Sequence, residues 1–291
     1  PRIPDTHMSR DASEQRRITR IALEAAGPDA GFALAGSGAI REHGFIDRPT
    51  EDVDLFTTQS AQHEFAPALG RVVAALQEAG YDVEIRERHP CFSRLVVTRD
   101  SSEPVATVDL GVDWRAEDPV RLAVGSVLAP DDAVGNKVAA LFSRGEARDY
   151  LDVDRIRASG RYRDQRLIEL GHRSDLGFEI TQFVRRLEEV GRVQPFEVAI
   201  YEVSPEQLRA VKDRCLAWAR ELRARVFGDP IPPRGQAAGS DGITDPRNWL
   251  AFWGGAEREG VGQYLPWSEL QCLACVIMRS ALLEIDWQNW I

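Results

Sequence analysis

The sequence is poor in lysine and carries no net positive charge. Only Lys137 and Lys212 are lysine among its 36 basic residues, and 46 acidic residues bring the formal net charge to −10. This charge argues against a chain that wraps broadly around nucleic acid, because phosphate binding needs a positive surface. A local basic groove remains compatible with it, and residues 154–173 hold six arginines and one histidine. The alternative interpretation is that this chain simply uses arginine throughout.

Long apolar runs are also missing. No run approaches the ~18 residues of a membrane span, and the chain is charged throughout up to about Gly27. We therefore expect neither a membrane segment nor a secretory signal, and we predict a cytoplasmic protein. At 291 residues, of which 43% are hydrophobic, the chain is long enough for one large core or two modest ones.

Cysteine occurs only four times. Cys272 and Cys275 form a C-x-x-C pair, a spacing that also occurs in redox and zinc sites. Here the pair lies in the apolar run LQCLACVIM, whose spacing is typical of a buried helix face, and no second pair of metal ligands lies nearby in the sequence. We expect structural thiols.

Hydrophobic periodicity divides the chain into a mixed first part and a helical second part. The first part has helical patterns at 9–26, 39–43 and 60–80, and strand-like runs at 32–35, 53–57, 81–87, 92–98 and 105–112. The second part has helical patterns at 131–143, 146–158, 178–190 and 205–227. These patterns predict an α+β protein, with a small mixed β-sheet backed by helices on one face and followed by a mostly α-helical C-terminal domain.

The last part of the chain has a different composition. Residues 228–248 are rich in glycine, proline and aspartate, which predicts a linker or a long loop. A tryptophan-rich segment follows, with a helical pattern at 268–284.

The most informative segment is GSGAIREHGFIDRPTEDVDLF, residues 36–56. Gly36 and Gly38 allow a ligand to approach the backbone closely, and Ser37 can cap the helix that follows, whose N-terminus would then face an anion. Asp52 and Asp54 alternate with apolar residues along a strand, so their carboxylates point to the same side. A divalent cation relieves the repulsion between two such carboxylates and supplies a Lewis acid.

A third carboxylate is expected on a neighbouring strand, because two-metal phosphoryl transfer needs ligands for both ions. The run VATVDLGVDW offers Asp109 and Asp113, which lie about 13 Å apart along a strand, so only one of them can join the first two acids. We favour Asp109, because an acid in mid-strand between apolar residues is costly without a partner. Asp113 stays open as the alternative, and it is equally explained as a solvated strand end.

The segment NKVAALFSRGEARDYLDVD, residues 136–154, supplies cations. On a helix, Lys137, Arg144 and Arg148 would lie along one face beside an apolar stripe, where they could reach triphosphate oxygens. The alternative is a solvated basic edge. Asp149 and Asp152, spaced three apart, are better suited to orienting arginine or lysine side chains than to binding metal.

Together these motifs resemble the AbiEii/AbiGii toxin family of nucleotidyltransferases, which are related to DNA polymerase β-type transferases. The resemblance rests on G-S, D-V-D-L-F, the strand acid, N-K-x-x-A-L-F-x-R and A-R-D-x-x-D in this order, and it covers roughly residues 30–227. The gap from Ser37 to Asp52 is longer than the ten residues of the short form of the family pattern. Residues 228–291 match no part of that pattern.

The resemblance implies a role for each motif. Gly36 and Ser37 would bind NTP phosphates, Asp52 and Asp54 would hold Mg²⁺ or Mn²⁺, and Lys137 would contact the triphosphate or support the site. The predicted catalytic residues are Asp52, Asp54, Asp109 and Lys137, and the first three of these are also the predicted metal ligands. The predicted nucleotide-binding residues are Gly36, Ser37, Lys137, Arg144, Arg148, Asp149 and Asp152.

The resemblance also implies a function and a domain division. The protein would transfer NMP from an NTP to tRNA as the toxin of a toxin–antitoxin pair, with a cognate antitoxin as partner. A small-molecule or protein acceptor is one alternative, and an inactive nucleotide-binding or partner-binding module is another. We expect a nucleotidyltransferase core at 1–128, a helical domain that completes the site at 129–227, and a linker with a tryptophan-rich segment at 228–291.

Overall fold

A computed structural model of the chain describes residues 8–48, 50, 52–99 and 104–227. The described strands form a single sheet in the order β3-β4-β5-β2-β1-β7-β6. It is mixed, because β2 runs parallel to β5 and β1 parallel to β7, while the other neighbours are antiparallel. The strands are β1 (Ala33–Leu34), β2 (Asp52–Thr57), β3 (Asp82–His89), β4 (Phe92–Thr98), β5 (Pro104–Val112), β6 (Val120–Leu122) and β7 (Gly125–Val127).

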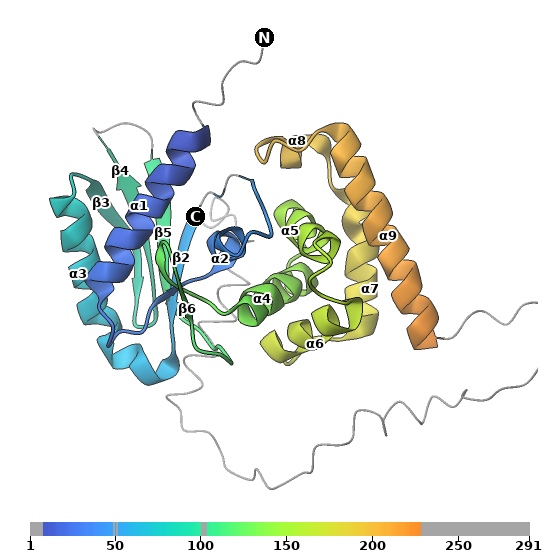
Figure 1. Cartoon of the computed structure of the whole chain (residues 1–291), viewed down its shortest axis with the longest axis horizontal. Coiled ribbons are helices and arrows are strands. Elements are labelled where there is room, and N and C mark those ends of the chain that lie inside the picture. Colours follow the sequence, from blue (N-terminus) through green and yellow to red (C-terminus); the bar gives the residue numbers. More distant parts are fainter. Residues whose placement is uncertain (1–7, 49, 51, 100–103, 228–291) are drawn as a thin grey trace, which may run out of the picture.

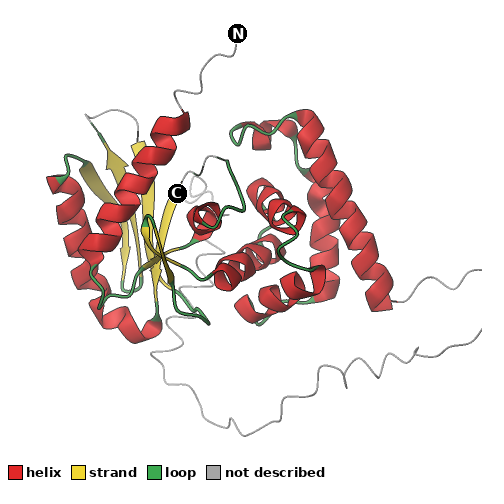
Figure 2. Cartoon of the chain, in the orientation of Figure 1, coloured by secondary structure: helices red, strands yellow, loops and turns green. Residues whose placement is uncertain are grey.

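The other regular elements of the described chain are helices. They are α1 (Met8–Ala26), α2 (Gly36–Glu42), α3 (Phe65–Glu78), α4 (Pro130–Ser143), α5 (Ala147–Ala158), α6 (Asp164–Ser174), α7 (Ile180–Glu188), α8 (Pro195–Ala199) and α9 (Pro205–Phe227), with 3₁₀ turns η1 (Gln59–Glu64) and η2 (Glu189–Arg192). In Figure 1 the helices from α4 onward gather on one side of the molecule, and the sheet lies with α1 and α3 on the other. The colouring by secondary structure in Figure 2 shows the same separation.

Apolar periodicity explains how the helices attach. Helix α1 buries Ile18, Ala22 and Ala26 at intervals of four, and it packs along α3 and against several strands. On the other side, α2 lies against both β2 and α4. Helix α2, whose first residues are the Gly-Ser-Gly segment, therefore stands between the sheet and the helical half.

The predicted class of α-helices with a small mixed sheet is confirmed, with additions. The hairpin of β6 and β7 and the helices α6 and α8 were not predicted. Strands of three residues and a helix of five are too short to show a periodicity. In α6, the apolar side chains are limited to Leu167, Ile168 and Leu170, so the basic composition of residues 154–173 hid the helix.

Several arginines of that basic segment are paired with acids. Arg157 pairs with Asp164 and Glu221, and Arg166 pairs with Asp131 and Glu169. Arg173 pairs in the same way with Glu117 and Asp132. Half of the arginines in the segment are therefore neutralised by carboxylates, which favours general use of arginine as the interpretation.

Two sets of predictions lie outside the described residues: the linker at 228–248 with the tryptophan-rich segment, and the Cys272 and Cys275 pair. Within the described part, both cysteines, Cys91 and Cys215, are buried thiols. None of the helices that the structure describes has the length and apolar character needed to cross a bilayer.

Candidate active site

The Gly-Ser-Gly turn packs directly on a carboxylate. Gly36 has a φ of 56°, a left-handed conformation that side chains disfavour. A Cβ atom added there would overlap the carboxylate of Asp54, whose Cγ would be 2.7 Å away. Just before the turn, the Ala35 N–H donates to the backbone oxygen of Asp54 at 2.8 Å. The glycine therefore lets the turn and the acidic strand touch.

Strand β2 presents its two acids on one face. Val53 and Leu55 are buried in the core, while Asp52 and Asp54 are partly exposed. On the parallel neighbour β5, Asp109 is the register partner of Asp54. Neighbouring residues of adjacent strands point to the same side of a sheet. The structure thus brings all three predicted carboxylates together on one sheet face.

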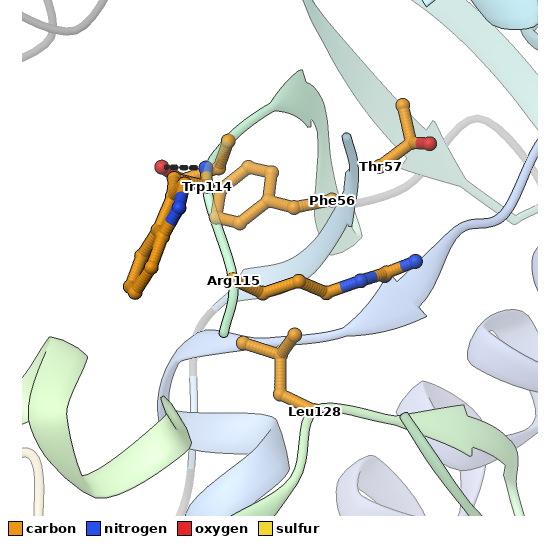
Figure 3. Close-up of a pocket in the computed structure, with 6 residues that line it drawn as sticks. Phe56, Thr57, Trp114, Arg115 and Leu128 are labelled. Atoms are coloured by element: carbon orange, nitrogen blue, oxygen red, sulfur yellow. Dashed lines mark hydrogen bonds between the residues drawn. The ribbon is translucent and has the colours of Figure 1, made fainter. Parts of the chain in front are cut away.

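Asp113 lies at the other end of these strands. Its N–H donates to the Thr57 oxygen at 2.8 Å, at the end of β2 away from Asp52, and its carboxylate accepts from the Trp114 N–H. Figure 3 shows this end, where a small pocket is lined by Phe56, Thr57, Asp113, Trp114, Arg115 and Leu128. The structure therefore separates Asp113 from the acidic pair and leaves Asp109 beside it.

Ser37 is the centre of a partly buried network. Helix α2 begins two residues earlier than a Ser37 cap requires, with Ala35 in the capping position, so the expected Ser37 cap is wrong. Its hydroxyl instead accepts from Lys137 Nζ at 2.7 Å and donates to Asp152 at 3.2 Å. Lys137 also pairs with Asp152 at 2.9 Å. Lys137 is therefore held beneath the turn, within the protein.

Asp152 is fully buried, and it also accepts two hydrogen bonds from Arg48, each of 2.8 Å. Burial alone would raise the pKa of this carboxyl, but Lys137 and Arg48 together hold the pKa below its ordinary value. The carboxylate is charged at neutral pH, and it orients both cations.

The other predicted cations come from two helices, because Gly145 interrupts the segment with a φ of 63°. The expected single ridge is thus wrong: Arg144 follows the last residue of α4, and Arg148 lies in α5. A left-handed glycine is the usual helix stop, and it turns α5 to a new direction.

Both arginines nevertheless face the acids. Arg148 lies 3.6 Å from Asp52 and 2.8 Å from Glu146. Arg144 binds the fully buried Asp149 through two hydrogen bonds, of 2.9 and 3.0 Å. Burial lowers the pKa of Arg144, but the carboxylates of Asp149, Glu146 and Asp54 outweigh burial and raise it. Apart from Asp113, the predicted residues thus form one connected set.

Sequence reasoning missed Arg94. It lies in β4, which is the antiparallel neighbour of β5, and it is the register partner of Asp109. Its guanidinium donates to both carboxylate oxygens of Asp109, each at 2.8 Å, and these bonds raise the pKa of Arg94. The signal was a single arginine inside the otherwise uncharged strand FSRLVVT. The alternation of inward and outward residues in β4 could not show which acid Arg94 would pair with.

The carboxylates suit a hard divalent cation, although arginines lie against Asp52 and Asp109. Asp52 and Asp54 are partly exposed and offer oxygen ligands, the type that Mg²⁺ prefers. Asp109 has only 6% of its side chain exposed and is engaged by Arg94. Among the described residues, no three histidine, cysteine or acidic side chains are arranged as a metal-binding group. The oxygens of Asp52 and Asp54 therefore fit a divalent cation. At Asp109 the guanidinium of Arg94 would compete with the cation for the carboxylate.

Comparisons with solved structures identify proteins of similar fold. MenT4, the nucleotidyltransferase toxin Rv2826c of Mycobacterium tuberculosis H37Rv, is 16% identical over 75% of this chain and 87% of that chain, with a TM-score of 0.51. JHP933 of Helicobacter pylori is 18% identical over 76% and 94% of the two chains, with a TM-score of 0.47. A putative nucleotidyltransferase from H. pylori is 17% identical over 77% and 98%, also at 0.47.

A search of curated proteins gave no match. The family model of the nucleotidyl transferase AbiEii toxin, described as a type IV toxin–antitoxin system, matches residues 20–221. This range includes every predicted site residue and more than half of the chain. The protein therefore belongs to the AbiEii family of nucleotidyltransferase toxins.

Proposed function

We propose that the protein is a Mg²⁺-dependent toxin that transfers NMP from an NTP to a hydroxyl group of tRNA. One observation carries the proposal: the Gly36 turn packs on Asp54 within a face of three carboxylates, and arginines from the helical half face those carboxylates. Nucleotidyl transfer requires a turn that binds phosphate, acidic ligands for metal, and cations that stabilise the charge on the phosphates.

In the proposed reaction the acceptor oxygen attacks the α-phosphorus of the NTP. The new P–O bond forms as the bond between the α- and β-phosphates breaks, and pyrophosphate leaves. The hydroxyl proton passes to a base, for which Asp109 is the candidate, because it adjoins Asp54 in register. Arg94 would hold the carboxylate of Asp109 in a fixed orientation for this contact.

Asp52 and Asp54 would hold the divalent cation, which supplies Lewis-acid stabilisation of phosphate charge when bound. Gly36 and Ser37 would contact the phosphates, with Lys137 supporting Ser37 from below. Arg144 and Arg148 would stabilise the leaving pyrophosphate. Asp149 and Asp152 would act by fixing Arg144 and Lys137. Either Mg²⁺ or Mn²⁺ fits the oxygen donors.

The two halves of the site come from different parts of the chain. The turn and the three strand acids precede Val127, the last residue of β7, and Lys137, Arg144 and Arg148 follow Pro130, the first residue of α4. This supports a division into a core at 1–128 and a helical domain at 129–227 that completes the site. The family assignment supports a cognate antitoxin as partner.

The acceptor is the least constrained part of the proposal. The family supports a toxin, and the family resemblance favours tRNA, whereas the net charge of −10 favours a small-molecule or protein acceptor. Salt separates these classes, because a tRNA acceptor releases counterions when its phosphates bind. A KM for tRNA that rises steeply between 50 and roughly 200 mM salt is expected.

The decisive experiment incubates the full chain with each α-labelled NTP, Mg²⁺ and total tRNA. Wild type should label tRNA, and Asp52→Asn and Asp54→Asn should lose at least about 100-fold in rate, since each removes a metal-binding charge. Lys212→Gln, outside the site, serves as the matched control. If wild type labels no acceptor, or if the Asp variants label as well as wild type, the proposal fails.

A further inference from the structure

Arg48 reaches from the loop after α2 into the helical half of the protein. Only 10% of its side chain is exposed. Besides its two bonds to Asp152, its Nη2 donates to the Ser37 hydroxyl at 3.1 Å. Arg48 therefore connects the turn assigned to the nucleotide with a buried carboxylate of α5.

An aromatic ring lies against the guanidinium of Arg48. Its guanidinium carbon lies 4.6 Å from the centroid of the Tyr201 ring, within the range of a cation–π contact. Tyr201 is half-buried and lies between α8 and α9. Tyr201 thus lies against the arginine that connects Ser37 with Asp152.

The backbone around Tyr201 is held tightly. The N–H groups of Tyr201 and Glu202 donate back to Val198 and Ala199 at 3.1 and 3.0 Å. Glu202 has a φ of 58°, the only positive φ outside glycine among the residues the structure describes. A left-handed glutamate is disfavoured, so the surrounding structure must enforce it. The ring is thereby presented at a fixed position.

Charge favours a ring over an acid at this position. Lys137 and Arg48 are two cations that both pair with Asp152 inside the protein. An aromatic face adds attraction to Arg48 without a further negative charge. A carboxylate at the position of Tyr201 would cancel the positive charge beside Ser37, whereas a ring preserves it for an incoming phosphate.

We propose that Tyr201 is a positioning residue that holds Arg48 against Ser37 and thereby sets the affinity of the Gly36–Ser37 turn for NTP. The inference rests on the proposed nucleotidyl transfer, and it adds a residue outside the family motifs described above. Tyr201 contacts Arg48, and Arg48 in turn fixes the position of the Gly36–Ser37 turn before the nucleotide binds. Its loss should therefore weaken NTP binding and leave the chemical step largely intact.

The test compares Tyr201→Ala with Tyr201→Phe in the full chain. We expect Tyr201→Ala to raise the KM for NTP roughly three- to tenfold, with kcat within about twofold. Tyr201→Phe keeps the ring and should restore the KM. Phe196→Ala is the matched control, because Phe196 belongs to α8 and is 78% exposed. It should leave the KM unchanged.

A second measurement needs no activity. Hydrogen exchange of the amides of residues 43–48, without nucleotide, should accelerate in Tyr201→Ala and return to the wild-type rate in Tyr201→Phe. The inference is overturned if Tyr201→Ala matches wild type in KM and exchange, or if Tyr201→Phe is as impaired as Tyr201→Ala. If the wild type transfers no NMP, the proposed function is refuted, but the inference about Tyr201 is not. In that case the Kd for a non-hydrolysable NTP replaces the KM, and equal Kd values in wild type and Tyr201→Ala, or no binding at all, overturn the inference.

Discussion

Gly36 and Asp54 are so close that a methyl group on the glycine would overlap the carboxylate, with its Cβ only 2.7 Å from the Asp54 Cγ. The contact joins the turn that would cradle phosphate to the strand that would hold metal. Gly36 meets two requirements: its φ is left-handed, and it has no side chain. The absence of a side chain is what makes room for the Asp54 carboxylate.

Gly36→Ala should abolish activity beyond what backbone strain explains. The added methyl group must displace the Asp54 carboxylate, so we expect the rate of NMP transfer to fall at least about 100-fold. Gly44→Ala is the matched control, since Gly44 has a φ of 73° but no atom near an added Cβ. It should lose only about 1 kcal/mol of stability. Similar transfer rates in the two variants would contradict the role of the contact.

Asp109 and Asp113 offer a second matched pair. Asp109 adjoins Asp54 in register, while Asp113 lies at the far end of β2 beside Thr57. We expect Asp109→Asn to lower kcat by about 100-fold or more, as for loss of a catalytic base, and Asp113→Asn to stay within about twofold of wild type. Steady-state rates with labelled NTP measure both. Equal losses would mean that the register does not define the site.

The sequence predicted the content of the site better than its connections. Alternation in DVDLF correctly indicated that Val53 and Leu55 are buried and that Asp52 and Asp54 share the other face. Alternation fixes a face, but it cannot fix which residue of another strand lies alongside. The pairing of Asp109 with Arg94 depends on the register between β4 and β5, which only the folded sheet determines.

Long-range contacts were beyond reach for a related reason. Arg48 and Asp152 are 104 positions apart in the chain, and their pairing depends on how α5 packs on α2 through α4. The break at Gly145 was different, because a glycine after a helical run is a local stop signal. Treating Arg144 and Arg148 as one ridge overlooked that signal.

Asp152→Asn should destabilise the protein in a pH-dependent manner. The folded pKa of Asp152 lies below its ordinary value, so its stabilisation is present above about pH 4 and is lost as the pH falls through the folded pKa. We expect the variant to lose about 3 kcal/mol at pH 7, because Lys137 and Arg48 lose their buried counterion.

Urea unfolding at pH 7 and near pH 3 tests this expectation. The difference in unfolding free energy between wild type and Asp152→Asn should shrink at the lower pH. Glu84→Gln is the control, since 65% of the Glu84 side chain is exposed and its pair with Arg86 is at the surface. A difference that is the same at both pH values would show that Asp152 stabilises by packing alone.

Arg94 should compete with a divalent cation for Asp109. Both ligand oxygens of that buried carboxylate accept hydrogen bonds from the guanidinium, so Arg94→Ala leaves a carboxylate that a cation can compensate. We expect Arg94→Ala to lose about 2 kcal/mol without metal, a moderate value because 35% of the Arg94 side chain is exposed. Mn²⁺ should then restore more stability to the variant than it adds to wild type, since a ligand stabilises the state that binds it.

Thermal unfolding as a function of Mn²⁺ concentration measures this difference, with Arg86→Ala on β3 as the surface control. An equal Mn²⁺ effect in wild type and Arg94→Ala would assign the cation to Asp52 and Asp54 alone.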